Sequence, residues 1–258
     1  MPPIYEDQNN HVLDHPHVFL DEIMRQAQNS EIIRLSMWIR EGKPIGTFPC
    51  ANEQVMIFRN YELEPSMYDW ADQTLCATNK TRIQINNDVR LRQGRGIEPE
   101  VGDKIIGLTN HWDFLSTNQQ WALTNGTIGI ITNYQIMPYF YPPQIYDKEV
   151  KFMFTGMEIE NGRFESIPID YNAIITGEQA FDKKQLFAIN NFAREGEGLE
   201  APYNFTYAYA ITVHKAQGSE WDKVLLKEEK FPFEQNEHRR WLYTGITRAT
   251  KKLVIIRK

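Results

Sequence analysis

The sequence contains only two cysteines, Cys50 and Cys76, among its 258 residues. Two cysteines are too few for a disulfide framework or for a zinc site built on cysteine. No apolar run approaches the ~18–20 residues that a membrane-spanning helix needs. The first residues also lack the basic and apolar stretches of a signal peptide. These absences argue against disulfide-rich secreted proteins and integral membrane proteins, and we expect a cytoplasmic location.

The composition is that of a globular chain. Hydrophobic residues make up 41% and aromatic residues 12% of the sequence, which is enough for one large or two modest domains with buried cores. The formal net charge of −6 argues against a polybasic binder of the histone type. The average charge nevertheless conceals local differences.

Two segments of this acidic chain are basic. Residues 78–95 hold five Lys and Arg against one acid, and residues 203–258 hold eleven against six. Such segments indicate contacts with an anion at defined places. The alternative is that they are solvated faces, and charge alone favours that alternative.

The hydrophobic pattern divides the chain into α/β flanks and a β-rich middle. In the flanks we expect helices at 20–27, 31–39, 81–91 and 237–248, and strands at 54–59, 74–77, 207–213, 224–226 and 253–256. In the helix at 81–91, Ile83, Asn87 and Arg90 are expected to share one face.

The middle of the chain resembles a small barrel. Short strands are expected at 104–108, 127–132, 151–154 and 166–169, with helical character at 177–195. The aromatic run at 139–143 allows two interpretations, a platform for stacking bases or a packed turn, and we favour the turn.

Residues 210–222 combine a strand with groups that suit ligand binding. The strand leads into Thr212, His214 and Lys215, followed by Gly218 and Glu220. Polar groups at the carboxyl end of a strand are placed where α/β sheets bind ligands. Gly218 permits close approach of the backbone, and Glu220 can accept from a sugar hydroxyl. The alternative is a polar loop after an edge strand.

Residues 241–249 end in a second candidate group, Arg248. It follows a predicted helix and lies near Thr244 and Thr247 in the sequence. A guanidinium stays ionised and carries five donors, so an arginine held rigidly here would stabilise phosphoryl charge.

Together these two segments resemble a known family. Thr-Val-His-Lys-Ala-Gln-Gly-Ser-Glu-Trp-Asp at 212–222 resembles motif V of superfamily 1 DNA helicases, and Leu-Tyr-Thr-Gly-Ile-Thr-Arg-Ala at 242–249 resembles motif VI. The similarity is to the RecD-like and phage Dda-like branch, with a UvrD-like C-terminal domain. The likeness to Dda makes a phage origin an expectation.

The resemblance extends over nearly the whole chain. Pro2-Pro3 is similar to the end of motif III, and residues 20–26 to motif IV. Residues 76–86 resemble the DNA-contacting motif that follows, and residues 101–104 with 125–129 resemble an SH3-like barrel inserted in this branch. This implies a second RecA-like motor domain over 1–95 and 206–258, interrupted by a barrel at 96–205.

The resemblance also implies roles for individual residues. Arg25 and Arg248 would contact the γ-phosphate of ATP, with Arg248 as the arginine finger. Gln26, Gly218 and Glu220 would line the nucleotide side. Single-stranded DNA would be held, mainly through its phosphates, by Thr78, Asn79, Arg82, Thr212, His214 and Lys215.

The sequence departs from the family in one respect. It contains no Gly-x-x-x-x-Gly-Lys-Ser/Thr segment, which would cradle the phosphates and hold Mg²⁺. Residues 18–22 have a superficial likeness to a Walker B strand, but the motif IV interpretation fits Arg25 and Gln26 better. The chain is therefore predicted to be the second half of a motor, from a truncated, split or mis-started gene.

Two functions follow from these patterns. The first is the C-terminal half of an ATP-dependent 5′–3′ DNA helicase of replication or repair, which uses ATP and Mg²⁺ only with an N-terminal ATP-binding half. The alternative is a stand-alone, non-catalytic module that binds single-stranded DNA or docks on a replication protein. The presence of Arg25, Arg248 and Glu220 favours the first, because the alternative has no use for them.

Overall fold

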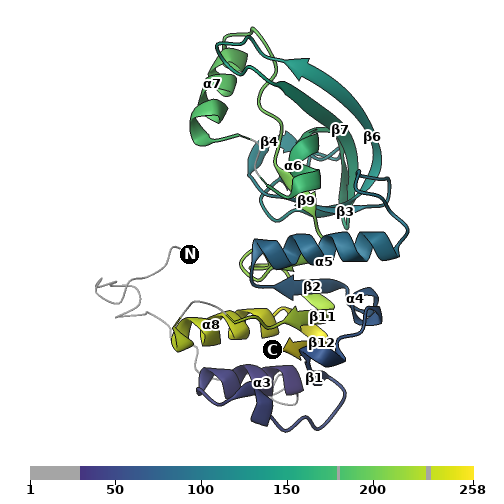
Figure 1. Cartoon of the computed structure of the whole chain (residues 1–258), viewed down its shortest axis with the longest axis vertical. Coiled ribbons are helices and arrows are strands. Elements are labelled where there is room, and N and C mark those ends of the chain that lie inside the picture. The colour runs from purple at the N-terminus through teal and green to yellow at the C-terminus, as the bar shows by residue number, and fades with distance from the viewer. Residues whose placement is uncertain (1–29, 179–180, 231–233) are drawn as a thin grey trace, which may run out of the picture.

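The structure, a computed structural model, describes residues 30–178, 181–230 and 234–258. Two bodies lie one above the other along the long axis, with helix α5 (Asn79–Arg92) at their junction (Figure 1). Each body contains a five-stranded sheet. Among the helices of the described ranges, none has the length and apolar character of a membrane span.

The lower body is built on a parallel sheet with the strand order β1-β12-β11-β2-β10. Its central strands are runs of β-branched and aliphatic residues, which suit strands that are buried on both faces. The predicted α/β architecture of the flanks is confirmed for the described residues. The strands are β1 (Val55–Arg59), β2 (Gln73–Cys76), β10 (Ala210–Thr212), β11 (Trp221–Lys227) and β12 (Ala249–Arg257).

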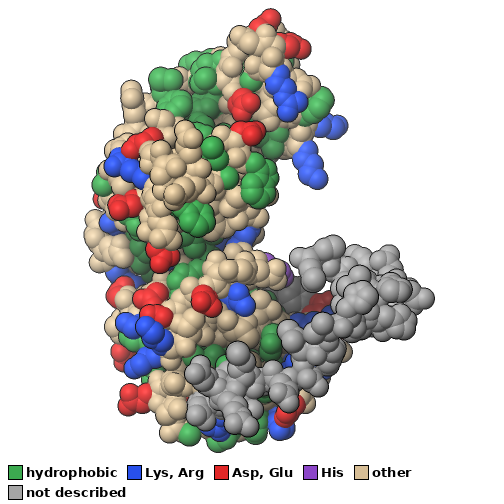
Figure 2. Space-filling model, turned by 180° about the vertical axis from the view of Figure 1, so that it is seen from behind, with side chains coloured by type: hydrophobic (Ala, Val, Ile, Leu, Met, Phe, Trp, Pro, Cys, Tyr) green, Lys and Arg blue, Asp and Glu red, His purple; other side chains and the backbone are tan. Residues whose placement is uncertain are grey.

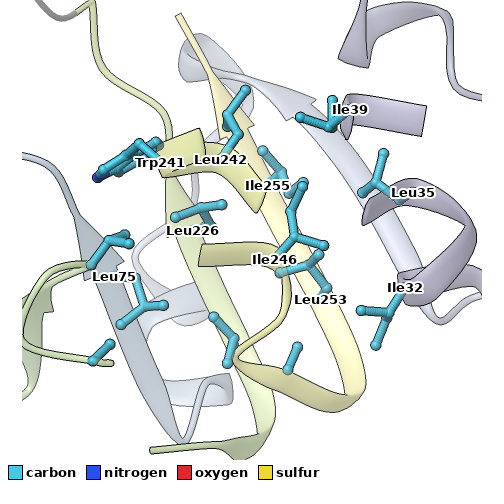
Figure 3. Packing of buried hydrophobic residues seen from close by; sticks show 14 of the residues in the cluster. Ile32, Leu35, Ile39, Leu75, Leu226, Trp241, Leu242, Ile246, Leu253 and Ile255 are labelled. Atoms are coloured by element: carbon cyan, nitrogen blue, oxygen red, sulfur yellow. The ribbon is translucent and has the colours of Figure 1, made fainter. Parts of the chain in front are cut away.

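Helices cover both faces of this sheet because alternate strand residues point to opposite sides. On one face, Leu226 and Leu253 pack against α3 (Glu31–Arg40) and α8 (Gln235–Ile246) (Figure 3). On the other face, Leu225 and Val254 pack against residues around α4 (Ser66–Trp70). Two short 3-10 helices, Ile45–Thr47 and Asn60–Glu62, connect these elements.

The upper body is an antiparallel sheet with the order β8-β7-β6-β3-β9. The sheet closes on itself, because Asp170 N donates to Tyr203 O at 3.0 Å and Tyr203 N donates to Pro168 O at 2.6 Å, beside an isolated parallel bridge between Ile169 and Tyr203. The middle of the chain is therefore β-rich, as expected. Its strands are β3 (Lys104–Gly107), β6 (Ile128–Phe140), β7 (Glu149–Ile159), β8 (Gly162–Asp170) and β9 (Phe205–Tyr207), with a separate pair, β4 (His111–Leu115) and β5 (Ala122–Leu123).

The aromatic run at 139–143 is packed against its surroundings. The buried Tyr141 donates to Glu200 O at 3.1 Å, and Tyr139 lies edge-on to Phe152. This agrees with the packed arrangement that the sequence favoured, although Phe140 is exposed. Green hydrophobic side chains are visible across the upper body in Figure 2.

Two element predictions were wrong. The expected strand at 207–213 is split: Tyr207 ends β9 in the upper sheet, and Ala210 begins β10 in the lower sheet. The buried Asn86 satisfies the backbone at this switch, donating to Tyr207 O and Ala210 O and accepting from Ala210 N. Residues 206 and 207, placed in the flanking domain by the sequence, therefore lie in a strand of the upper sheet.

The helix expected at 177–195 begins later than predicted. Gly177 ends α6 (Tyr171–Thr176) in a left-handed conformation, and α7 (Lys183–Arg194) begins after the capping residue Asp182. Glycine at this position is the usual helix stop. Gly177, which the sequence pattern placed at the start of a helix, thus ends the preceding helix α6.

One face of α5 is polar and buried. Arg82, Asn86 and Arg90 recur every four residues, and each is at most 5% exposed. This spacing aligns them on one side of the helix, toward the upper body. Ile83, Asn87 and Arg90 are spaced along one face of this helix as expected, but of these three only Arg90 is buried.

Arg90 and Asp103 form a fully buried ion pair between α5 and the start of the upper body. Arg90 Nε and one terminal nitrogen each lie 3.0 Å from a carboxylate oxygen of Asp103. The same guanidinium donates to the carbonyls of Gly96, Ile97 and Glu98. Arg90, which the charge pattern assigned to an anion or to solvent, instead holds the fold together.

We predict that Asp103→Asn lowers the free energy of unfolding by about 3–5 kcal/mol, because it leaves the Arg90 charge buried without compensation. The measurement is urea denaturation. The control is Asp69→Asn, which removes an exposed pair with Arg92 and should cost at most about 1 kcal/mol. Equal losses in the two variants would contradict this account of the Arg90–Asp103 pair.

Candidate functional site

A cavity of about 430 Å³ lies at the junction of the two bodies. It opens at the carboxyl ends of β2 and β10, where parallel sheets place their ligand sites. None of the described residues that line it is acidic. They are Ala77, Asn79, Arg82, Ile106, Leu108, Gly177, Thr206, Ile211, Thr212, His214 and Lys215.

Arg82 is a buried cation in the wall of this cavity. Its guanidinium donates to Asn79 Oδ1 at 3.3 Å, to Gly177 O at 3.0 Å and to the hydroxyl of Thr206. All three acceptors are neutral. Burial lowers the pKa of Arg82 from its ordinary value, yet an arginine stays protonated in proteins. A buried positive charge whose bonds go to neutral groups favours an anion nearby.

Lys215 brings a second positive charge to the same cavity. It follows β10, and its Nζ donates to Asn125 Oδ1 at 2.8 Å, in the turn between β5 and β6. Desolvation, and next the charge of Arg82, lower the pKa of Lys215 from its ordinary value. The smaller of these two causes is repulsion between the two cations, which a phosphate bound beside them would relieve.

Thr212 and His214 complete the wall that comes from the loop after β10. Thr212 is the last residue of the strand and is buried, whereas His214 is exposed. The loop is tightly folded: Lys215 N and Ala216 N both donate to Thr212 O, and Ser219 N donates to Ala216 O. These backbone bonds fix where His214 and Lys215 project from the sheet edge.

Thr78 and Asn79 lie at the beginning of α5. Thr78 caps the helix by accepting from Thr81 N at 3.2 Å. A carboxylate occupies the same end: Glu229 accepts from Ala77 N at 2.6 Å and from Thr78 N at 3.1 Å. The backbone amides of Ala77 and Thr78, just before the helix, are therefore already engaged.

The structure brings most of the predicted DNA-contacting residues together. Five of them line the cavity, and Thr78 lies at its rim beside Ala77. Sequence reasoning missed the residues that the upper body and the strand after motif V contribute. These are Asn125, Gly177, Thr206 and Glu229.

A second candidate site lies at the other end of the loop after β10, around the side chain of Arg248. Arg248 donates to Ser219 O at 3.0 Å, to Thr244 O at 3.1 Å and to Thr247 Oγ1 at 3.1 Å. These bonds hold the guanidinium beside residues 218–220. Each acceptor is neutral, so within the described part of the chain no carboxylate pairs with Arg248.

Gly218 and Glu220 border this group. Gly218 has φ of +88° with open space where a side chain would lie, so its backbone is accessible to a ligand. Glu220 is exposed. The other two residues predicted for the nucleotide side, Arg25 and Gln26, lie outside the described residues.

The chain is similar in structure to two solved helicases. One is Pif1 helicase from Candida albicans, with a TM-score of 0.47 and 17% identity, covering 91% of this chain and 55% of that chain. The other is Pif1 helicase from Bacteroides in complex with ADP-AlF3 and ssDNA, with a TM-score of 0.44 and 14% identity, covering 88% of this chain and 49% of that chain. The chain thus spans about half the length of these proteins.

The sequence itself matches a family over the two motif segments. Residues 207–256 match the family described as the UvrD-like helicase C-terminal domain. This stretch contains β10, β11, α8 and most of β12, together with the loop that joins the cavity to Arg248. The matched stretch contains both segments, 212–222 and 242–249, whose motifs resemble those of superfamily 1 helicases, so the family match agrees with that resemblance.

Proposed function

We propose that this chain is the C-terminal motor half of an ATP-dependent DNA helicase, and that single-stranded DNA binds in the cavity at the junction of the two bodies. The observation that carries the proposal is the pair of cations, Arg82 and Lys215, in a cavity among whose described lining residues none is acidic. A cavity of this kind suits a phosphate backbone better than a neutral ligand.

Single strands rather than base pairs fit the chemistry of this lining. The charged donors Arg82 and Lys215 and the hydroxyl of Thr212 suit phosphate oxygens, and such contacts are indifferent to sequence. The apolar residues Ile106 and Leu108, from the upper body, offer a surface for the nucleoside part. DNA held here would touch both bodies.

ATP would bind on the side of Arg248. Three of its five N–H groups are fixed by neighbouring oxygens, which leaves the others for a γ-phosphate. Glu220 would accept from the ribose, and the accessible backbone at Gly218 would allow close approach of the nucleotide. Bound ATP would supply the free energy of translocation.

The chain does not by itself offer a complete nucleotide site. No phosphate-cradling loop is present in the sequence, so the proposal assigns the Mg²⁺ ligands and the catalytic carboxylate to an N-terminal RecA-like half. The 5′–3′ polarity, the RecD- and Dda-like branch and the SH3-like nature of the upper body rest on the sequence resemblance. The closed β-rich sheet supports the last of these.

For DNA binding, we expect Lys215→Gln to weaken the affinity for a fluorescein-labelled oligothymidylate about tenfold, because one phosphate contact is lost. The slope of log K against log salt should fall by about 0.7. Fluorescence anisotropy at several salt concentrations measures both. Lys251→Gln is the control, since Lys251 is exposed and pairs with Asp222. An unchanged affinity and slope for Lys215→Gln would contradict the proposed site.

For ATP hydrolysis, we expect negligible turnover by this chain alone and DNA-stimulated turnover after addition of an N-terminal half that carries a P-loop. Arg248→Ala should then reduce kcat by at least about 10³-fold, the usual contribution of an arginine finger. A coupled-enzyme ATPase assay measures both.

The control for this assay is Arg163→Ala, which alters an exposed pair with Glu165 and should leave kcat unchanged. Full activity of Arg248→Ala, or rapid turnover by the pure chain, would contradict the assignment. DNA binding without recovery of ATPase on mixing would favour the stand-alone binding module.

A further inference from the structure

We propose that Glu229 is an internal competitor of DNA: its carboxylate occupies the place of a backbone phosphate at the rim of the cavity, and DNA must displace it. The inference rests on the proposed function, because it concerns the same binding site. It adds that a residue of the chain itself lowers the affinity for DNA, which the sequence motifs do not indicate.

The carboxylate of Glu229 is bound as a phosphate would be. It accepts from Ala77 N at 2.6 Å, from Thr78 N at 3.1 Å and from Thr78 Oγ1 at 3.3 Å, and also from the hydroxyl of Thr81. Two backbone amides and two hydroxyls thus converge on one anionic group. All four donors belong to the junction between β2 and α5.

An independent observation indicates that this position belongs to the DNA site. Ala77 and Asn79 are lining residues of the cavity that holds Arg82 and Lys215, and Ala77 also donates to Glu229. Arg82 is 5% exposed and bonds only to neutral acceptors there. A strand whose phosphate meets these cations therefore runs beside the donors that Glu229 occupies.

A phosphate and the Glu229 carboxylate cannot share these donors. Both are anions, and at contact distance in a partly buried place they repel each other. DNA that uses Thr78 must therefore move Glu229 away, and the cost lowers the observed affinity.

The surroundings of Glu229 allow this movement. It follows the end of β11, and among the described residues it forms no ion pair. The adjacent Glu228 differs, because it pairs with Arg257 at 3.1 Å and with His238 at 3.0 Å. Two neighbouring glutamates thus have opposite roles: one anchors the end of the sheet, and the other lies at the rim of the site without a cation.

The test is the affinity of a fluorescein-labelled oligothymidylate for the full chain. Glu229→Gln keeps the shape and removes the charge, and we expect it to bind about fivefold to tenfold more tightly than the wild type. Glu228→Gln removes the same charge one residue away and should bind like the wild type. Unchanged or weaker binding by Glu229→Gln would overturn the proposal.

A second variant tests whether Glu229 competes with DNA or only holds Thr78 in position. Glu229→Ala removes all four bonds, so a competitor predicts tighter binding, whereas a residue that merely fixes Thr78 predicts weaker binding. The amide signals of Ala77 and Thr78, followed by NMR as the oligothymidylate is added to the wild type, should shift as phosphate replaces carboxylate. Signals that stay in place would count against displacement.

The substitution Lys215→Gln, made in the wild type and in the Glu229→Gln variant, distinguishes the competitor proposal from the proposed function. If Lys215→Gln weakens binding and Glu229→Gln has no effect, the DNA site stands and the competitor is rejected. If neither the wild type nor Glu229→Gln binds the oligothymidylate, the proposed function fails, and the competitor fails with it.

Discussion

The buried pair of Arg90 and Asp103 determines how the two bodies sit on each other. Asp103 accepts from Tyr209 Oη at 2.9 Å, and the Arg90 guanidinium lies 4.0 Å from the centre of the Tyr207 ring. The pair thus contacts both places where the chain crosses between the bodies, after α5 and before β10. Because a buried pair is stable only with all its partners in place, it fixes one orientation. The cavity depends on that orientation, since its walls come from both bodies.

Helix α5 connects this structural pair to the candidate site. Arg82, Asn86 and Arg90 lie on one face, and each bonds to a different part of the chain: the cavity wall, the strand switch and the buried carboxylate. The helix begins at the rim of the cavity and ends at Asp103. If DNA binds as proposed, its contact with Arg82 would act on the same helix that carries Arg90 and so bears on the placement of the upper body.

Sequence reasoning found what depends on local pattern and missed what depends on distant contacts. The apolar runs at 224–226 and 253–256 indicated parallel strands, and the order of polar groups after residue 210 located the loop that lines the cavity. The split between Tyr207 and Ala210 left no local signal, because both halves are equally apolar and buried. Asn125 and Glu229 meet their partners 90 and 152 residues away, and no short motif encodes such pairs.

Two pairs of like-charged residues in this chain differ in whether an opposite charge lies beside them. Arg90 and Arg82 lie on one helix two turns apart and are equally hidden from solvent, yet the first has a carboxylate partner and the second has neutral acceptors only. The same contrast holds between Glu228, which is paired, and Glu229, which is not. Of these four residues, the two without an opposite partner lie at the cavity: Arg82 lines it, and Glu229 lies at its rim. The charge of Arg90 is thus neutralised within the fold, whereas the uncompensated charge of Arg82 lies where the proposed DNA site needs a cation.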